Sequence, residues 1–346
     1  MAHSSERNTP RKRRRGAVAA GFVCLAAGLV LMKWLPWPFQ PYALLFLVAI
    51  VLSIVAMVQR RVWMGLLLLL STIMVPPALL LAGFAGPQQV ADTSFRPPIE
   101  KPAYPAGQGP TVQVDEAHSN FHTSTGRYLP FAELLRRDGY VVKASAVQFT
   151  AKALEAGRVL VIANAVTIPV PAEVAAVREW VAGGGSLLLI ADHAPFDAAA
   201  RELGKVFGVR FLKGAAVEPG ADGFRLVFRR SEGTLADHPV TTGIDSVATF
   251  YGSAFETDSP GQPLLVFGPR VHLRRPDSES PASLKGFLQG AVMPYGNGRV
   301  AVFGEAAMFS AQLADFRREP MGMNAPIARQ NPQFLLNVMH WLTGPG

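Results

Sequence analysis

Three long apolar stretches open the chain. They cover Gly16–Met32, Pro41–Val58 and Val62–Phe84, and none contains a charged residue. A helix needs roughly 20 apolar residues to cross the hydrocarbon core of a bilayer, within a range of about 17–25. The pattern therefore predicts three transmembrane helices, which form a membrane anchor over residues 1–84 with the lipid bilayer as its partner. The alternative is a cleaved signal peptide for the first stretch and core helices for the other two, but no small-residue cleavage site follows the first stretch.

Basic residues flank these stretches unevenly. Arg11–Arg15 precede the first stretch, and Arg60 and Arg61 separate the second from the third, whereas the loop after the first contains only Lys33. Basic residues favour the cytoplasmic side of a membrane. The sequence therefore predicts a multi-pass protein of the inner (cytoplasmic) membrane with its N-terminus inside and its large domain facing outside the cytoplasm. Residues 85–110 are rich in Pro and Gly, so we expect an extended linker there.

From residue 111 onward, short apolar runs alternate with amphipathic segments. The predicted strands are Thr111–Val114, Tyr140–Ala144, Arg158–Ala163 and Ser186–Ala191, and the predicted helices are Pro130–Asp138, Val170–Ala182 and Asp197–Phe207. Continuous aliphatic strands that alternate with helices indicate a parallel sheet covered on both faces. The sequence therefore predicts an α/β domain over residues 111–346, built on a doubly wound parallel sheet.

Residues 209–285 lose this alternation. They contain only short strand candidates between turns, so we expect an insertion that partly covers the sheet. After it, Gly296-Asn297-Gly298 predicts a hairpin between Ala291–Tyr295 and Arg299–Phe303. Pro332–Leu342 has helical spacing and is the last predicted helix.

The charge of the chain is confined to its N-terminal part. Residues 1–84 contain nine basic residues and one acid, whereas the other 262 residues contain 24 of each. A nucleic-acid-binding face needs a surplus of Lys and Arg, so we expect no nucleic acid as a partner of the large domain. The single cysteine, Cys24, excludes disulfides within the chain, cysteine-based zinc sites and iron–sulfur clusters.

Polar residues follow three of the predicted strands. In open α/β sheets, ligands bind beyond the carboxyl ends of the strands, so these side chains are candidates for one site. We expect catalytic roles for Asp115, Glu116, His193 and Glu305, ligand binding by Asn120, Arg127, His238 and Asn324, and metal binding by His118, His122 and Asp192. Each residue taken alone also fits a structural role, as a helix cap or a hydrogen-bonded histidine.

Two chemistries fit this set. Imidazole and carboxylate groups together suit zinc or a similar divalent metal, with Glu305 as a base acting on metal-bound water. The known metalloprotease spacing has Glu directly after the first His, and Ser119 stands there instead. Without a metal, the same groups can perform acid–base catalysis or bind a polar ligand such as a sugar.

The segment Glu173–Phe196 (EVAAVREWVAGGGSLLLIADHAPF) resembles the class I glutamine amidotransferase-like superfamily. Within it, the chain is similar to an uncharacterised, membrane-anchored bacterial family, a domain of unknown function with a comparable stretch near Asp115–His122. The resemblance implies a flavodoxin-like, amidotransferase-like fold over about residues 111–342. Asp192 and His193 occupy the turn where true amidotransferases carry their cysteine nucleophile, which excludes cysteine-dependent glutaminase activity.

Two functions remain open at this point. One is a membrane-anchored extracytoplasmic domain that binds a polar envelope ligand or a membrane protein partner. The other is a hydrolase, metal-dependent or not, that acts on envelope sugars or peptides. The fold by itself favours neither, because one fold supports many functions.

Overall fold

The structure is a computed structural model of the 346-residue chain. It describes residues 19–30, 41–58, 62–81, 89–220, 225–258, 261–275, 282–314 and 318–344. The chain divides into two compact units, residues 1–88 with 315–317, and residues 89–314 with 318–346. Each unit is described by itself below.

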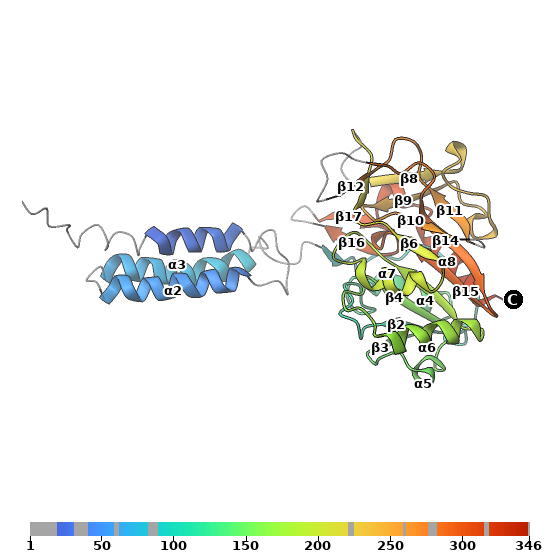
Figure 1. Cartoon of the computed structure of the whole chain (residues 1–346), viewed down its shortest axis with the longest axis horizontal. Helices are drawn as coiled ribbons and strands as arrows, with labels where there is room; N and C mark the ends of the chain where they lie inside the picture. Colours follow the sequence, from blue (N-terminus) through green and yellow to red (C-terminus); the bar gives the residue numbers. More distant parts are fainter. Residues whose placement is uncertain are drawn as a thin grey trace, which may run out of the picture. The chain divides into compact units, whose positions relative to one another are not determined.

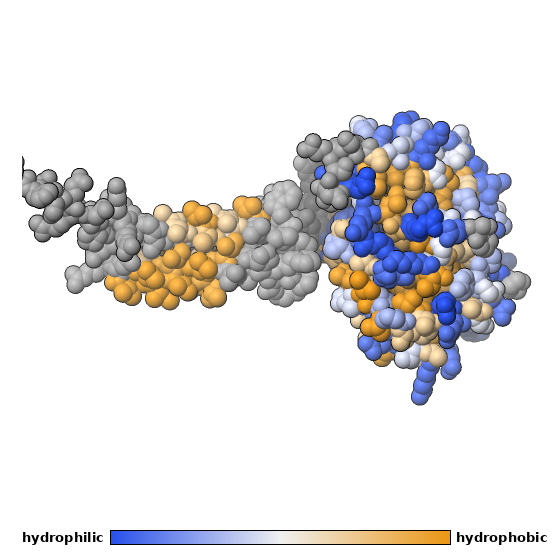
Figure 2. Space-filling model, in the orientation of Figure 1, coloured by the Kyte–Doolittle hydropathy of each residue, from blue (hydrophilic) through white to orange (hydrophobic). Residues whose placement is uncertain are grey.

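The described part of the first unit is helical. It contains a helix over residues 19–30, α2 (Pro41–Val58) and α3 (Val62–Leu81). A small core of Leu25, Ala49 and Leu68 joins these helices. Many of their other apolar side chains are exposed, and Figure 2 shows hydrophobic colours over most of the described helical surface.

The prediction of three transmembrane helices is wrong. Within the residues that the structure describes, no helix is long and apolar enough to cross a lipid bilayer. The described helix over residues 19–30, for example, has 12 residues, which at about 1.5 Å per residue is far shorter than the roughly 30 Å of a hydrocarbon core. The predicted inner-membrane location, with the large domain outside the cytoplasm, depended on those helices and is therefore wrong as well.

The second unit is built on a nine-stranded mixed sheet (Figure 1). Five parallel strands lie in the order β3-β2-β4-β5-β15. Their bounds are β2 (Thr111–Asp115), β3 (Val141–Ser145), β4 (Val159–Ala163), β5 (Ser186–Ile190) and β15 (Gly298–Phe303). Beyond β15 the order continues with β14 (Leu288–Tyr295), β10 (Phe255–Thr257) and β6 (Val209–Phe211), all antiparallel, and β11 (Gln262–Val266) also pairs with β14.

The expectation of an entirely parallel sheet is therefore wrong. The predicted hairpin around Gly296 is confirmed, and it turns the chain back so that β14 runs antiparallel to β15. Gly296 has φ of 58°, which glycine adopts without steric penalty.

Helices cover both faces of the parallel strands. One face packs against α4 (Leu129–Arg137) and α8 (Asn331–Thr343), through side chains such as Phe131 and Phe334. The other face packs against α5 (Ala151–Leu154), α6 (Pro171–Ala182) and α7 (Ala198–Lys205). Because successive residues of a strand point to opposite faces, Leu188 joins the first core and Leu187 the second.

Three smaller sheets complete the unit. One has the order β1-β16-β17, the second β13-β12-β7, and the third contains β8 and β9. Their bounds are β1 (Gln89–Ala91), β7 (Ala215–Val217), β8 (Arg225–Arg229), β9 (Ser246–Phe250), β12 (His272–Arg274), β13 (Ala282–Ser283), β16 (Ala311–Ala314) and β17 (Glu319–Gly322). Short 3₁₀ turns lie at η1 (Arg230–Glu232), η2 (Pro239–Thr241), η3 (Ala307–Phe309) and η4 (Pro326–Ala328). Of the strands in residues 209–285, β6, β10 and β11 extend the central sheet instead of only covering it.

The segment expected to be a linker belongs in part to the folded unit. β1 pairs antiparallel with β16. Farther along, Phe95, Ile99 and Tyr104 pack against the core on the α4 side. Prolines exclude a helix here, but they do not prevent an extended chain from lying along an apolar surface.

The start of β15 gives a test of this packing. A Cβ atom at Gly298 would collide with the backbone carbonyl oxygens of Val181 and Gly185, neither of which can move without disturbing α6 or β5. We expect Gly298→Ala to lower the free energy of unfolding by about 2 kcal/mol or more, measured by denaturant unfolding. Gly268→Ala is the matched control, because the nearest atom to its Cβ, Thr234 Cγ2, lies at 3.5 Å. Equal stability of the two variants would contradict the observed register.

Candidate functional site

Four strand ends meet at one edge of the sheet. Asp115 ends β2, Asn164 follows β4, and Asp192 and Glu305 lie two residues beyond β5 and β15. From β2 the chain continues to α4 on one face, and from β4 to α6 on the opposite face. Such a switch opens a crevice between the two strands, where α/β proteins bind ligands.

Asp192 and Glu305 form a buried acidic pair. Ile190 pairs with Phe303 in the sheet, so the two acids extend from neighbouring strands at the same level. Asp192 is 8% exposed and Glu305 is completely buried. Backbone N–H groups hold both carboxyls: His193 N donates to Asp192 at 2.8 Å, and Ala307 N and Met308 N donate to Glu305 at 2.7 and 2.8 Å.

Burial keeps this pair from carrying two charges. Burial raises the pKa of Glu305, and the nearby charge of Asp192 raises it further. Burial also raises the pKa of Asp192, although hydrogen bonds from His193 N, Ala306 N and the Asn164 side chain oppose the shift. Buried like charges cannot both ionise cheaply, so the pair retains a proton at pH values where exposed carboxyls have lost theirs.

A buried imidazole, His122, packs against Tyr128 in the same unit. The His122 ring packs against the Tyr128 ring at 4.6 Å between centroids, and the Tyr128 hydroxyl donates to the carbonyl of Ala306 at 2.9 Å. Neither ring nitrogen of His122 has a hydrogen-bond partner among the described residues. Burial, together with the charge of Arg127, lowers the pKa of His122 to about 3, so the ring is neutral at physiological pH.

Half-buried aromatic side chains form a connected group that reaches the acidic pair through His193, the residue after Asp192. The Arg127 guanidinium lies 3.7 Å from the centroid of the Phe121 ring, which contacts Phe196 at 4.5 Å. His193 lies 6.1 Å from Phe196 and 4.7 Å from Tyr251. We call Phe121, Phe196, His193 and Tyr251 the aromatic rim. It is continuous in these contacts and partly accessible to solvent.

The backbone at these strand ends is unusual. Three non-glycine residues have positive φ there, namely Ser119 at 54°, Asn164 at 49° and Tyr251 at 80°. This region is unfavourable for residues with a Cβ atom, and most so for a bulky side chain. Such conformations concentrate at functional sites, because the surrounding structure must enforce them.

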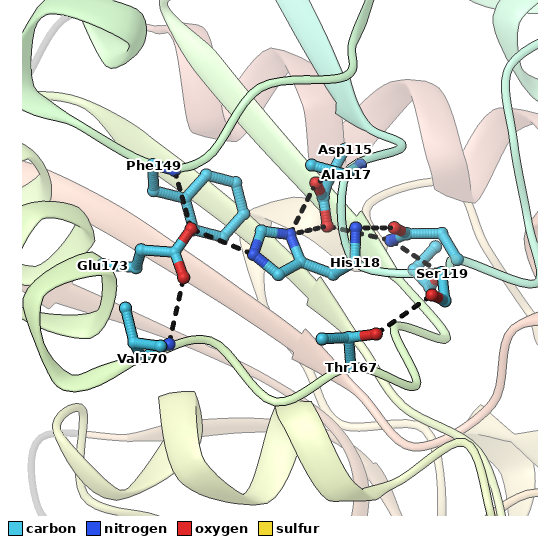
Figure 3. Close-up of polar contacts among 10 residues, drawn as sticks. Asp115, Ala117, His118, Ser119, Phe149, Thr167, Val170 and Glu173 are labelled. Atoms are coloured by element: carbon cyan, nitrogen blue, oxygen red, sulfur yellow. Dashed lines mark hydrogen bonds and ion pairs between the residues drawn. The ribbon is translucent and has the colours of Figure 1, made fainter.

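A second polar cluster lies at the end of β2 (Figure 3). His118 Nδ1 faces Asp115 Oδ1 at 2.9 Å, and Nε2 faces Glu173 Oε1 at 3.1 Å. Burial by itself lowers the pKa of His118, but the hydrogen bonds and charges of the two acids outweigh it and raise the pKa above the ordinary value. Both nitrogens donate hydrogen bonds when the ring is protonated, so the three side chains form a buried carboxylate–imidazolium–carboxylate chain.

The predicted metal site is not assembled. Both ring nitrogens of His118 face carboxylates, and the Asp192 carboxyl accepts hydrogen bonds from backbone and from Asn164. His122 packs against Tyr128 instead of pointing at either. Across the described ranges, no three His, Cys, Asp or Glu side chains are arranged to hold a metal ion.

Four other predicted residues have structural partners. Glu116 accepts hydrogen bonds from Ser124 N and Oγ, and Asn120 donates to Asp115. His238 begins η2, where Nδ1 accepts from Val240 N, and Asn324 donates to Asp92 and to the carbonyl of Gln312. None of these contacts joins them to Asp192 or Glu305.

The sequence interpretation missed several residues of this region, including Phe121 and Phe196 of the aromatic rim. Asn164 and Tyr251 follow strands, as the predicted residues do, but an amide or a phenol after a strand carries no distinctive chemistry. Glu173 resembles an ordinary first-turn acid, since it follows Pro171 at the start of α6. Its contacts with His118, 55 positions away, and with Phe149 N set it apart.

The comparisons with known proteins identify a family and a fold. A family model described as a domain of unknown function (DUF4350) matches residues 123–315, which is more than half of the chain. No curated protein matches. The N-terminal domain of mmIFT52 is similar in fold, with a TM-score of 0.53, 15% identity, and coverage of 67% of this chain and 97% of that domain.

Two further solved structures are similar at a looser level. A cytoplasmic protein from Salmonella typhimurium has a TM-score of 0.44 at 17% identity, with 67% of this chain and 98% of that chain covered. A putative ThuA-like protein from Parabacteroides merdae has a TM-score of 0.40 at 14% identity, with 68% and 89% covered. At these scores neither likeness carries an argument.

These findings correct the resemblance drawn from the sequence. The family model that matches is DUF4350, and the mmIFT52 domain is similar in fold with a TM-score of 0.53. The assignment to the class I glutamine amidotransferase-like superfamily, and to a membrane-anchored branch of it, is therefore wrong. Short motifs such as Gly183-Gly184-Gly185 before a strand mark a helix end in many α/β folds, which is why they misled.

The acidic pair predicts a specific pH dependence. A carboxyl whose pKa is raised in the folded state binds more protons folded than unfolded, so its contribution to stability falls as pH rises from about 4 towards the raised pKa. We expect the stability difference, parent minus Glu305→Gln, to decrease over this range by at most about 1.4 kcal/mol per pH unit. Denaturant unfolding at several pH values measures it.

Glu179→Gln is the matched control for this measurement, since the Glu179 side chain is 73% exposed. The difference in free energy of unfolding between the parent and Glu179→Gln should stay nearly constant with pH. A constant difference for Glu305→Gln as well would mean that the pKa of Glu305 is the same in the folded and unfolded states, which would contradict the raised pKa of this buried carboxyl.

Proposed function

This chain belongs to the DUF4350 family, and we propose that its α/β unit binds a small, neutral, hydroxyl-bearing ligand at the ends of β4, β5 and β15. One observation carries the proposal. Two buried carboxyls, Asp192 and Glu305, extend from neighbouring strand ends beside His193 of the half-buried aromatic rim, and burial and mutual repulsion raise the pKa of both. Perturbed acids in such a place are typical of functional sites.

The acidic pair favours hydroxyl groups as partners. A protonated carboxyl donates one hydrogen bond, and the remaining oxygens accept others, which matches groups that both donate and accept. An anionic ligand would meet a second negative charge in a place of low dielectric constant, which disfavours it. The Asn164 Oδ1 atom, buried without a partner among the described residues, adds an acceptor beside Asp192.

The aromatic rim favours a ligand with an apolar face. Phe121 and Phe196 offer ring surfaces, and binding sites combine such surfaces with a few placed polar groups. A cyclic polyol such as a sugar presents C–H groups on one face and hydroxyls around its edge. This combination suits a rim of rings beside a carboxyl pair.

One observation favours hydrolysis as a second candidate function. His193 Nδ1 donates to the carbonyl of Ala194 at 2.8 Å, which leaves Nε2 with its lone pair, 3.9 Å from Asp192 Oδ1. Burial lowers the pKa of His193, so the ring stays neutral and able to accept a proton. A neutral base beside a protonated acid is an arrangement for acid–base catalysis.

Binding is tested directly with the full-length chain. Isothermal titration and thermal shift are measured against neutral mono- and disaccharides, polyols and the matching sugar phosphates. We expect saturable binding of neutral compounds only, with stabilisation of about 2.7 kcal/mol at a ligand concentration a hundred times Kd. Asp192→Asn and Phe121→Ala should each weaken binding by about tenfold or more, because each removes a ligand contact.

Glu179→Gln again serves as the control and should bind as the parent does. Binding that is equal in the parent and in Asp192→Asn would contradict the assigned site. Absence of saturable binding across the whole panel would contradict the ligand class.

Hydrolysis is separated from binding by one variant. If the bound compound is a glycoside or ester that is cleaved, His193→Gln should abolish product formation and change Kd by less than about threefold, because Gln keeps a hydrogen-bonding group but cannot take up a proton. Chromatography of the reaction mixture measures the product. An unchanged cleavage rate in His193→Gln would exclude this histidine as the base.

A further inference from the structure

We propose that His118 and Glu173 are positioning residues, which together with Asp115 hold residues 117–127 where Arg127 and His122 reach the ligand site. The inference rests on the proposed function for the identity of that site. The contacts that carry it involve no ligand, so they are tested independently of ligand binding.

Glu173 joins three separate loops. Its Oε1 accepts from Phe149 N at 3.0 Å and faces His118 Nε2 at 3.1 Å, and its Oε2 accepts from Val170 N at 3.0 Å (Figure 3). Phe149 follows β3, His118 follows β2, and Val170 precedes α6. A residue that only caps α6 would need only the contact with Val170. The contacts with Phe149 and His118 indicate that Glu173 also holds the two loops together.

Asp115 fixes the first turn of the loop on the opposite side of the imidazole. It accepts from Ala117 N at 3.1 Å and from Asn120 Nδ2 at 2.9 Å, in addition to His118 Nδ1. The His118 ring also lies 4.4 Å from the Phe149 ring and is 3% exposed. The imidazole is therefore held on both edges and on one face.

The loop is docked onto the end of β4 at the same place. Val166 N and Thr167 N both donate to the His118 carbonyl, at 3.0 and 2.9 Å. Ser119, with its positive φ, contacts Thr167 through the two hydroxyls at 3.0 Å. These contacts fix the positions of His118 and Ser119 just before the chain reaches Phe121.

The next residues carry the site. Phe121 N donates to the Asn164 carbonyl at 3.0 Å, and the Asn164 side chain is hydrogen-bonded to Asp192. Arg127 lies over the Phe121 ring and donates to the Phe121 carbonyl at 3.3 Å. A displaced His118 would thus move Phe121, and with it the stacked Arg127, away from the acidic pair.

Charge supports this arrangement. The titratable groups that face His118 are Asp115 on β2 and Glu173 on α6, while Phe149 and Thr167 contribute uncharged contacts. Hydrogen bonds between ionised groups are about twice as strong as neutral ones, so a short chain of them can hold a loop that has little apolar surface of its own.

Amide hydrogen exchange of the full-length chain tests the proposal, with Glu173→Ala and His118→Ala compared with the parent. We expect exchange at the amides of Phe121, Val166 and Thr167 to accelerate about tenfold or more, because the local opening loses charge-assisted hydrogen bonds. The amides of Leu160 and Leu188, in the centre of the sheet, should keep the parent rates. Glu179→Ala, on the exposed side of the same helix, should change neither set.

Chemical rescue separates positioning from general destabilisation. Added imidazole should restore loop protection in His118→Ala, by occupying the vacated space between Asp115 and Glu173, and should have no effect on Glu173→Ala. Loop amides that exchange at parent rates in both variants would overturn the proposal. Equal acceleration of loop and sheet amides, or failure of both variants to fold, would overturn it too, since both would indicate a structural role only.

Discussion

The parallel pairing of β15 with β5 is the constraint on which the site depends. β15 follows β5 by more than a hundred residues, yet it completes the buried sheet, with Val302 opposite Leu189 and Phe303 opposite Ile190. Its alternate side chains fill the cores on both faces, which fixes the register, because a slip by one residue would exchange the two faces. That register places Glu305 beside Asp192, and no feature of the local sequence around either acid does so.

Once the register is set, two opposing effects determine the state of the acids. Backbone N–H groups from η3 and from His193 favour ionised carboxyls, whereas burial and mutual repulsion favour protonated ones. Burial is the largest effect for both residues, so the proton is retained. The same hydrogen bonds prevent either side chain from turning away, which leaves the pair rigid and ready to meet a ligand without reorganisation.

The sequence predicted those parts of the structure that depend on local pattern. The aliphatic runs that form β2, β4, β5 and β15 were predicted to within a residue or two. A parallel strand that is buried on both faces consists mostly of aliphatic residues, which makes it recognisable in the sequence. Because parallel strands end at one edge, the sequence also predicted that Asp192, His193 and Glu305 share a site, and in the structure Asp192 and Glu305 extend from neighbouring strands. Whether they bind or catalyse stays a prediction.

Other features depend on distant partners and could not be read locally. β6 and β10 have three residues each, and only pairing with each other and with β14 makes them strands of the central sheet. β1 looked like part of a proline-rich linker because its partner, β16, lies more than 200 residues away. For residues 1–84, the number of apolar residues led to a wrong prediction of membrane-spanning helices. A stretch rich in Leu and Val also fits a helix that packs against neighbouring helices, and Leu25, Ala49 and Leu68 pack in this way.

The two polar clusters at the strand ends show why a titratable residue must be interpreted with its partners. His118 and His122 are four positions apart and both are buried, yet their pKa values move in opposite directions. His118 faces two carboxylates, which stabilise its charged form by more than burial destabilises it. His122 faces an aromatic ring and the positive charge of Arg127, so burial prevails and the ring is neutral. An imidazole held by two acids suits the fixing of a loop, whereas a neutral imidazole whose nitrogens have no partner among the described residues suits contact with an uncharged ligand. The difference between the two histidines therefore matches the two roles that we propose, with His118 in the part that holds the loop and His122 in the part to which we assign ligand binding.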